Sequence, residues 1–392
     1  MPVVLAQNTR WIKIVLHALF LVSGAVTVLI GQLLPIMAAH FHLSDLQLSL
    51  YFPSQFAGSV AGTFFNTTFA RRNQYLLSSM IGGVLMASGV LLMNIDSFAV
   101  TLVAFAVNGI GIGLTLPAIN MTILELSPVK TASALSILNF CWGVGAIVCK
   151  PFVDVSSRGS DILITTIGLA APLLIAAALL FLQPTRLISV EHTPATQAET
   201  SNIPIWTLPL AWAIALFNLI HVGFESGMGG WLTTYTDRMA HEHFTYWLSP
   251  TLLYFVFFVA GRGVAPMLFR FLNENKMLML GLLTVLAGVV LTVVAGSLLF
   301  LGVGAAIAGF GTSWIFPANV SRFSKTFGPA ASRRSTPFFI CGTLGAAAST
   351  WLIGFVSNQT GNLQYGMYVL AGSIVLLTIL QIGLGMRRVA PA

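Results

Sequence analysis

Long apolar segments, separated by short polar gaps, follow one another along the whole chain. Each is close to or above the roughly 20 residues that an α-helix needs to cross the hydrocarbon core of a bilayer. None shows the alternation over about ten residues that is typical of a strand in a membrane β-barrel. The pattern therefore predicts an all-α membrane protein with twelve transmembrane helices, although the gap at Gly296 and Ser297 is so short that two spans can be read as one. The predicted spans are 12–37, 46–69, 74–94, 98–123, 132–155, 161–183, 206–233, 249–271, 277–297, 299–320, 336–357 and 365–386.

The composition agrees with this pattern. Of the 392 residues, 56% are hydrophobic and only 7% are charged, and the mean hydropathy is +0.89. An ordinary soluble domain carries about 25% charged residues, so the composition excludes one. Cys141, Cys149 and Cys341 all lie within predicted spans, which argues against a disulfide or metal framework. None of the Gly-rich runs has the GxxxxGK(S/T) pattern of a phosphate-binding loop, so we expect neither an enzyme nor a bound cofactor.

The net charge of +7 raises the question of a nucleic-acid partner, but the positions of the charges argue against one. If the predicted spans are right, most of the 18 Lys and Arg residues, Arg322 among them, fall on one side of the membrane. The opposite loops hold only Arg158 and Arg238, while Lys150 and Arg262 lie within spans. Loops rich in Lys and Arg stay on the cytoplasmic side. We therefore expect a multi-pass monomer in a bacterial inner membrane, with both termini in the cytoplasm.

The chain repeats itself at a constant offset of 200 residues. Seven residues match in one register across two predicted spans and the loop between them. Internal repeats of this kind are typical of secondary transporters. The matched pairs are Gly109 and Gly309, Gly111 and Gly311, Pro117 and Pro317, Ala118 and Ala318, Cys141 and Cys341, Gly145 and Gly345, and Ala146 and Ala346.

The longest polar stretch of the chain, residues 183–202, separates the two copies of the repeat. It is rich in Thr, Pro, Ala and Glu and has no apolar period, which predicts a flexible cytoplasmic linker. We expect an N-terminal six-helix bundle at 1–183, the linker at 184–205 and a C-terminal six-helix bundle at 206–392. The repeat predicts that a pseudo-two-fold axis relates the bundles, which would rock against each other around a central cavity.

Glu225 and Arg262 are charges deep inside apolar segments. An ionised side chain near the bilayer centre costs at least about 2.5–3.5 kcal/mol on insertion scales, so it usually faces a partner or a cavity. Helix rise places the two within reach of each other. Glu225 would accept a hydrogen bond from a solute, or its protonation would couple transport to a proton gradient; a static ion pair is the structural alternative. Lys150 and Asp154, one turn apart, are expected to pair with each other.

The seventh predicted span holds the densest group of polar candidates. His221 lies four residues before Glu225 and shares its helix face. Trp231 follows after several glycines, and an aromatic ring near a carboxylate suits a polyhydroxyl ring, whose C–H faces stack while its hydroxyls find acceptors. The alternative for Trp231 is an interfacial aromatic belt. Further candidates for solute contact are polar or aromatic residues at mid-depth of other spans, namely Gln32, Asn120, Asn139, Trp142 and Asn319.

In these segments the chain resembles the major facilitator superfamily, and within it the sugar:cation symporters related to the fucose permeases. Gly62-Thr-Phe-Phe-Asn66 followed by Arg71-Arg72 is similar to the loop motif of the superfamily, with Asn66 in place of the usual acid. Val222-Gly223-Phe-Glu225 through Trp231 is similar to the seventh-span segment of the fucose permeases, which places Glu225 and Trp231 near a substrate. Asn139 falls where that family carries a sugar-contacting amide.

The first and fourth spans depart from the resemblance. Fucose permeases carry acidic coupling residues there, whereas this chain reads Leu29-Ile-Gly-Gln32 and Thr115-Leu-Pro-Ala118. Glu225 is therefore the main candidate for coupling to H⁺, with Na⁺ coupling and facilitated diffusion as alternatives. We expect a secondary transporter of a small polar solute, a sugar. The rival functions are an efflux carrier for amphipathic drugs or metabolites and a non-transporting membrane sensor.

Overall fold

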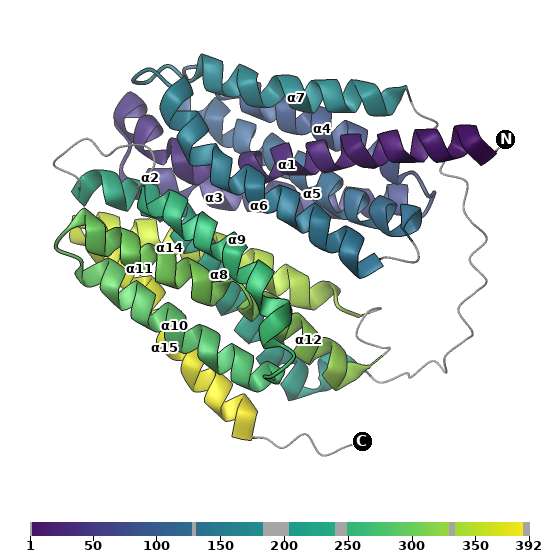
Figure 1. The fold of residues 1–392 in the computed structure, drawn as a ribbon. Coiled ribbons are helices and arrows are strands. Elements are labelled where there is room, and N and C mark those ends of the chain that lie inside the picture. The colour runs from purple at the N-terminus through teal and green to yellow at the C-terminus, as the bar shows by residue number, and fades with distance from the viewer. Residues whose placement is uncertain (1, 128–130, 183–203, 240–248, 329–333, 387–392) are drawn as a thin grey trace. The chain divides into compact units, whose positions relative to one another are not determined.

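The structure, a computed structural model, describes residues 2–127, 131–182, 204–239, 249–328 and 334–386 (Figure 1). In these ranges the regular elements are helices, apart from one isolated bridge between Arg158 and Asp161. Eleven helices of the described chain are long and apolar enough to cross a membrane. The predicted all-α membrane architecture is confirmed. The expected linker lies almost entirely outside the described residues.

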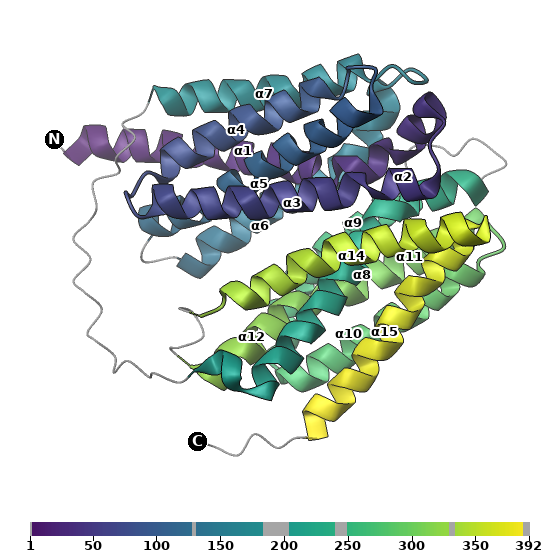
Figure 2. The same cartoon turned by 180° about the vertical axis from the view of Figure 1, so that it is seen from behind.

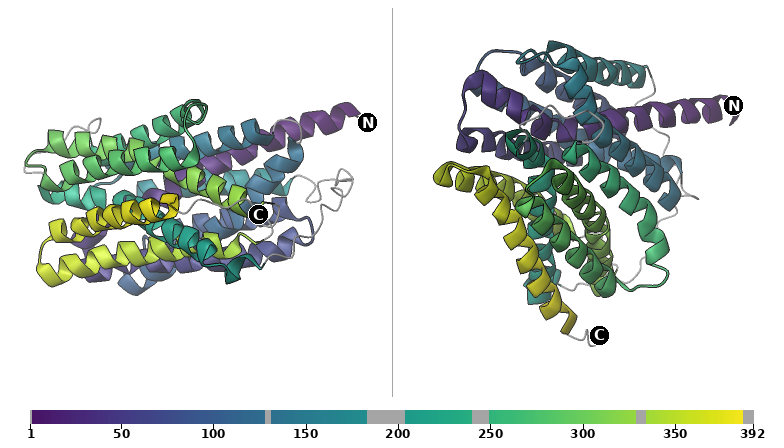
Figure 3. Two further views of the ribbon diagram at one scale, coloured as in Figure 1. Left: turned by 90° about the horizontal axis from the view of Figure 1, so that it is seen from below. Right: turned by 60° about the vertical axis from the view of Figure 1, so that its left-hand side comes forward.

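The chain divides into two compact units, of which the first comprises Met1–Leu43 and Leu50–Glu191. Figure 2 shows α3, α4 and α5 of this unit, and both views of Figure 3 show the start of α1 extending past its neighbours. The helices of unit 1 are α1 (Pro2–Phe41), α3 (Tyr51–Ala70), α4 (Tyr75–Leu92), α5 (Phe98–Leu126), α6 (Thr131–Ser156) and α7 (Leu163–Phe181). Of these, α3 is the second predicted span; it has 20 residues and is not one of the eleven helices that are long and apolar enough to cross a membrane.

The second unit comprises Ser44–Ser49 and His192–Ala392. Its short segment from the first half of the chain contains helix α2 and packs on α14. The sequence division had put this segment with the N-terminal bundle. The helices of unit 2 are α2 (Asp45–Ser49), the 3-10 helix η1 (Ile205–Thr207), α8 (Pro209–Met239), α9 (Pro250–Leu268), α10 (Glu274–Val294), α11 (Leu298–Thr312), α12 (Ile315–Phe327), α14 (Thr336–Thr360) and α15 (Leu363–Met386).

The repeat seen in the sequence marks where helices touch. A Cβ on Gly145 would lie 1.9 Å from the carbonyl oxygen of Leu21, and a Cβ on Gly345 would lie 1.9 Å from that of Leu219. These glycines let α6 pack closely on α1 in unit 1, and α14 on α8 in unit 2. Gly109 and Gly309 do the same for α5 against α3 and for α11 against α9. The matched residues are therefore equivalent helix crossings in the two units.

The same offset of 200 recurs at a helix start. Ser97 and Ser297 are the N-caps of α5 and α11, and each side-chain oxygen accepts a backbone hydrogen bond, from Val100 and Phe300 respectively. An N-cap serine supplies an acceptor to a backbone N–H that lacks a partner within the helix. Because α10 ends at Val294 and α11 begins at Leu298, the short gap at Gly296 and Ser297 separates two helices, as the count of twelve spans requires.

The units differ at one predicted span. In unit 1, α5 runs without interruption, whereas the predicted span 299–320 of unit 2 is divided into α11 and α12 by a break at Ser313 and Trp314. The hydroxyl of Ser313 donates to the carbonyl of Phe310 over 2.6 Å, and the indole N–H of Trp314 donates to the carbonyl of Met277 over 3.1 Å. Side chains thus hold the break in place.

Candidate functional site

Helix α8 carries His221 and Glu225 on one face, one turn apart. Nε2 of His221 lies 3.6 Å from Oε2 of Glu225, too far for a good hydrogen bond. The His221 side chain is fully buried, whereas that of Glu225 retains 26% of its exposure. Neither ring nitrogen of His221 has a hydrogen-bond partner among the described residues. The carboxylate is therefore accessible beside an imidazole that contributes no direct bond.

Helix α9 supplies the third member of this group. Nη2 of Arg262 lies 4.0 Å from Oε1 of Glu225, so the pairing expected from helix rise is confirmed as an ion-pair contact. The guanidinium lies over the ring of Phe258, 4.1 Å from its centroid, in a cation–π arrangement. The preceding residue, Gly261, packs against Ser313, because a Cβ there would lie 2.2 Å from the Ser313 hydroxyl. Close packing at the break after α11 therefore positions Arg262.

Tyr254 is a functional candidate that the sequence reasoning missed. It is buried on α9, and its hydroxyl has no hydrogen-bond partner among the described residues. Its ring stacks on that of Phe258, which Arg262 also contacts, and the charges of Glu225 and Arg262 act on its phenol. Tyr254 precedes Arg262 by eight residues, about two helical turns, so helical periodicity could have identified it. We call Glu225, His221, Arg262 and Tyr254 the charged cluster.

Two predicted solute contacts of unit 2 are held in packing instead. Trp231 has no exposed surface, and its indole N–H donates to the carbonyl of Thr350 over 2.9 Å. Asn319 is also fully buried, donates to the carbonyl of Ile214 and accepts a hydrogen bond of 2.5 Å from Arg322. Their hydrogen bonds connect α8 with α14 and α12, which gives both residues a structural role here.

Arg322 corrects one assignment made from the sequence. It was counted with the basic residues of the loops, but it lies half-buried within α12, inside the candidate membrane span Leu298–Phe327. Its guanidinium donates to Gln381 over 2.6 Å and lies 4.7 Å from the centroid of Phe217. The span ended later than hydropathy suggested because α12 is strongly amphipathic, with apolar residues on its buried face.

The remaining predicted contacts belong to unit 1. Gln32 is buried on α1. Asn120 on α5 and Asn139 on α6 each donate a 2.8 Å hydrogen bond to a carbonyl four residues earlier in the same helix. Trp142 is half-buried on α6, where its carbonyl lies against Gly24 of α1. The hydrogen bonds of Asn120 and Asn139 use their amide N–H groups, so their amide oxygens could accept a hydrogen bond from a solute.

Two further predictions from sequence concern polar links within unit 1. Lys150 and Asp154 form an ion pair on α6, as expected from their spacing. Asn66 of α3, which stands in place of an acid in the loop motif, accepts a 2.8 Å hydrogen bond from the hydroxyl of Ser78 on α4. A neutral hydrogen bond therefore joins α3 and α4 where an acidic residue would place a charge.

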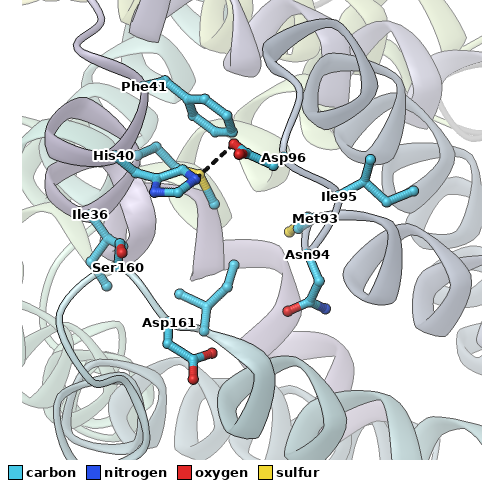
Figure 4. Close-up of a pocket in the computed structure, with 11 residues that line it drawn as sticks. Ile36, His40, Phe41, Met93, Asn94, Ile95, Asp96, Ser160 and Asp161 are labelled. Carbon is cyan, nitrogen blue, oxygen red and sulfur yellow. Dashed lines mark hydrogen bonds and ion pairs between the residues drawn. The ribbon is translucent and has the colours of Figure 1, made fainter.

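A pocket of about 230 Å³ lies at one end of unit 1. Figure 4 shows His40 and Asp96 directly joined, with Nε2 and Oδ1 2.9 Å apart, and Asp161 lying apart from this pair. The Asp96 side chain is 81% exposed, so water screens this pair strongly. The pocket therefore contains one weak ion pair.

A larger pocket in unit 2 is almost entirely apolar. It encloses about 640 Å³ between α9, α10 and α11, and its wall includes Leu253, Phe257, Leu299 and Phe310. Several of these side chains are exposed on helices of membrane-spanning length, as expected where a surface meets lipid tails. The sequence pattern gave no sign of this pocket, because apolar residues alone do not show where helices part.

Comparison with known proteins agrees with the fold. The family model described as Major Facilitator Superfamily matches residues 14–295. A search of curated protein sequences finds no match. The fucose:proton symporter of E. coli superposes with a TM-score of 0.63 at 19% identity, covering 95% of this chain and 98% of the symporter. The xylose transporter of E. coli gives 0.72 at 15% identity, covering 95% and 96%. A nucleoside transporter gives 0.76 at 12% identity, covering 97% and 99%.

Proposed function

As the chain belongs to the major facilitator superfamily of transporters, we propose that it carries a small polar solute, a sugar, across the membrane by cation-coupled symport. Glu225 supports this proposal most directly. It is an ionisable residue inside a membrane-spanning helix, it keeps some exposure, and its ionic neighbours are beyond hydrogen-bond distance. Because its ionic neighbours form no hydrogen bond with it, this carboxylate can bind a proton or accept a hydrogen bond from a solute hydroxyl.

The coupling role follows from the charges of the cluster. While Glu225 is ionised, its charge and that of Arg262 balance, and protonation removes the attraction between them. A conformational change that alters the distance between the two residues would therefore alter proton affinity, and by linkage proton binding would bias the conformational change. We propose H⁺ as the coupling ion and Glu225 as its site. Arg262 is the charge partner that makes the proton affinity of Glu225 sensitive to the conformational change.

The orientation is part of the proposal. The excess of Lys and Arg in the loops on one side supports cytoplasmic termini in a bacterial inner membrane. We propose that a monomer transports by alternating access of its two six-helix bundles. The sugar would contact Glu225 and Tyr254 in unit 2, and Gln32, Asn120, Asn139 and Trp142 in unit 1. Structural likeness to sugar and nucleoside transporters is compatible with a polyhydroxyl solute.

Uptake by purified protein in proteoliposomes tests this function. Labelled fucose, xylose, glucose and galactose would be offered under an inward proton gradient, an inward sodium gradient, or no gradient. We expect at least one sugar to accumulate under the proton gradient and only to equilibrate without it. Accumulation driven by sodium alone would reassign the coupling ion, and the absence of flux for all four would overturn the assignment to a neutral sugar.

The apolar pocket of unit 2 favours a second candidate, an efflux carrier for amphipathic drugs or metabolites. Its nearly uniform apolar lining, between Leu253 and Phe310 among others, matches the hydrocarbon part of such a compound. Competition between an amphipathic dye and the sugar distinguishes the two functions. An amphipathic dye that blocks sugar uptake and is itself pumped against a gradient would favour efflux, while sugar uptake that the dye leaves unchanged would favour symport.

A further inference from the structure

Arg262 has more binding capacity than its contacts use. A guanidinium has five N–H donors. Among the described residues, Arg262 makes no hydrogen bond; its contacts are the 4.0 Å approach to Glu225 and the ring of Phe258. A guanidinium that serves only to neutralise a buried carboxylate normally forms two parallel hydrogen bonds with it. Here 30% of the Arg262 side chain remains exposed, so its donors are available to another acceptor.

Within the described residues of unit 2, the surroundings supply no second counter-charge. Helices α11, α14 and α15, which complete the packing of unit 2, contain no Asp, Glu, Lys, Arg or His in their described lengths. On α12, Lys325 pairs with Glu274, and Arg322 donates to Gln381 and Asn319. The charged groups of this part of unit 2 that face Glu225 are therefore Arg262 and, when it is protonated, His221. The phenol of Tyr254 is the other titratable neighbour.

The charge balance then depends on the protonation of Glu225. With Glu225 ionised and His221 neutral, the cluster has a net charge of zero. When Glu225 binds a proton, the positive charge of Arg262 remains without compensation in a membrane-spanning helix, which is costly. A solute with one negative charge would restore neutrality, and a neutral solute would not. Proton binding therefore prepares the cluster for an anion.

Resting on the proposed transport function, we infer that the solute is a sugar acid, whose carboxylate binds Arg262 while Glu225 holds the co-transported proton. A planar carboxylate fits the fork of a guanidinium and accepts two parallel hydrogen bonds from it. The unpartnered hydroxyl of Tyr254 is a donor for the same carboxylate or for a ring hydroxyl. Binding of the anion with one proton would be electrically neutral, so the cluster would be uncharged in both the empty and the loaded states.

Two matched pairs of probes test this inference in the full-length purified protein. D-glucose and D-glucuronate differ only at C6, as do D-galactose and D-galacturonate. We expect at least one of the acids to raise the melting temperature more than its neutral partner at pH 5.5, with a smaller difference at pH 8. Acid binding should also take up protons from a weakly buffered solution, as followed with a pH-sensitive dye.

Variants of Arg262 make the test specific. Loss of a charge-assisted contact should weaken acid binding by about tenfold to a hundredfold in Arg262→Gln, while Arg262→Lys should keep part of the affinity. Arg270→Gln is the matched control, since Arg270 is an exposed arginine of the same unit.

If neutral sugars bind and are transported but neither acid does, the sugar-acid inference fails while the proposed function stands. If none of the four binds, the sugar assignment fails as well. Unchanged acid binding in Arg262→Gln would also overturn the inference.

Discussion

Oε1 of Glu225 and Nη2 of Arg262 lie 4.0 Å apart, close enough to attract each other and too far apart to share a hydrogen bond. Each residue is fixed by its own helix: α8 carries Glu225 one turn after His221, and close packing at Gly261 positions Arg262 on α9. The two charges thus interact without being bonded to each other. An ion pair of this kind can respond to a proton, a solute or a small helix movement.

Replacing Glu225 by Gln should separate binding from coupling. The amide keeps the shape and the hydrogen-bonding capacity of the side chain but cannot exchange a proton near neutral pH. We expect Glu225→Gln to lose accumulation driven by a proton gradient while it still exchanges labelled for unlabelled solute. Glu274→Gln is the control, because Glu274 lies on α10, pairs with Lys325 on α12 and is not a member of the charged cluster. Gradient-driven accumulation that survives in Glu225→Gln would remove this residue from the coupling mechanism.

Asp45 and Arg238 connect α2 to the end of α8 within unit 2. Arg238 donates two hydrogen bonds to the Asp45 carboxylate, one of them 2.8 Å long, and the hydroxyl of Ser357 donates a third. Burial raises the pKa of Asp45, but the hydrogen bonds from Arg238 and Ser357 outweigh it, so the pKa lies below its ordinary value. The stabilisation is therefore complete at neutral pH and is lost only as the pH falls through this lowered pKa.

Hydrogen exchange of the backbone of α2 would measure this contact. In Asp45→Asn, the amides of residues 46–49 should exchange faster at pH 7, by up to about fivefold for a partly exposed ion pair. Asp96→Asn is the matched control, because Asp96 is a highly exposed acid in unit 1. In the unchanged protein, protection of α2 should be constant between pH 8 and pH 5. A loss of protection already near pH 6 would contradict the lowered pKa.

The repeated glycines should be sensitive to a single methyl group. Gly345→Ala would place its Cβ 1.9 Å from the Leu219 carbonyl oxygen, so α14 and α8 would have to separate. Overpacking of this kind typically costs about 1–3 kcal/mol. Gly372→Ala on α15, where nothing lies within 4 Å of the new Cβ, should be neutral or stabilising by up to about 1 kcal/mol. Thermal unfolding in detergent compares the two variants. Equal melting temperatures of Gly345→Ala and Gly372→Ala would contradict a close crossing of α14 and α8 at Gly345.

Trp231 offers a test of a structural role against a binding role. Trp231→Phe removes the hydrogen bond to Thr350 and leaves space in a fully buried site. We expect a loss of about 1–3 kcal/mol in stability with no change in the KM for the transported solute. A raised KM in a variant with normal stability would return Trp231 to the list of solute contacts.

Part of the charged cluster could be predicted from sequence because its evidence is local or chemical. His221 and Glu225 are one turn apart on the same helix, so their proximity follows from helical geometry alone. Glu225 and Arg262 stand out because charges are rare in apolar segments. Tyr254 was missed because a tyrosine in a membrane helix is unremarkable until its hydroxyl is found to be buried without a described partner.

Arg322 and Asn319 show why the remaining predictions were incomplete. Both are polar residues near the end of a predicted span, and one was assigned to a loop and the other to a solute contact. The structure bonds them to each other and to α8 and α15. Their roles depend on which way α12 faces after the break at Ser313, and hydropathy averaged over a window does not contain that information.

The sequence by itself determined the membrane-spanning helices, the repeat at an offset of 200 residues and the identity of the rare buried charges. Each of these is a property of a short segment or of two segments compared with each other. Only the tertiary structure decided that Gly145 and Gly345 are helix crossings, that Trp231 is buried against Thr350, and that Tyr254 stacks on the Phe258 ring that Arg262 also contacts. The physical reason is that a helix surrounded by lipid and by other apolar helices is apolar on all sides. Its rotation and its neighbours are set by packing between residues far apart in the chain.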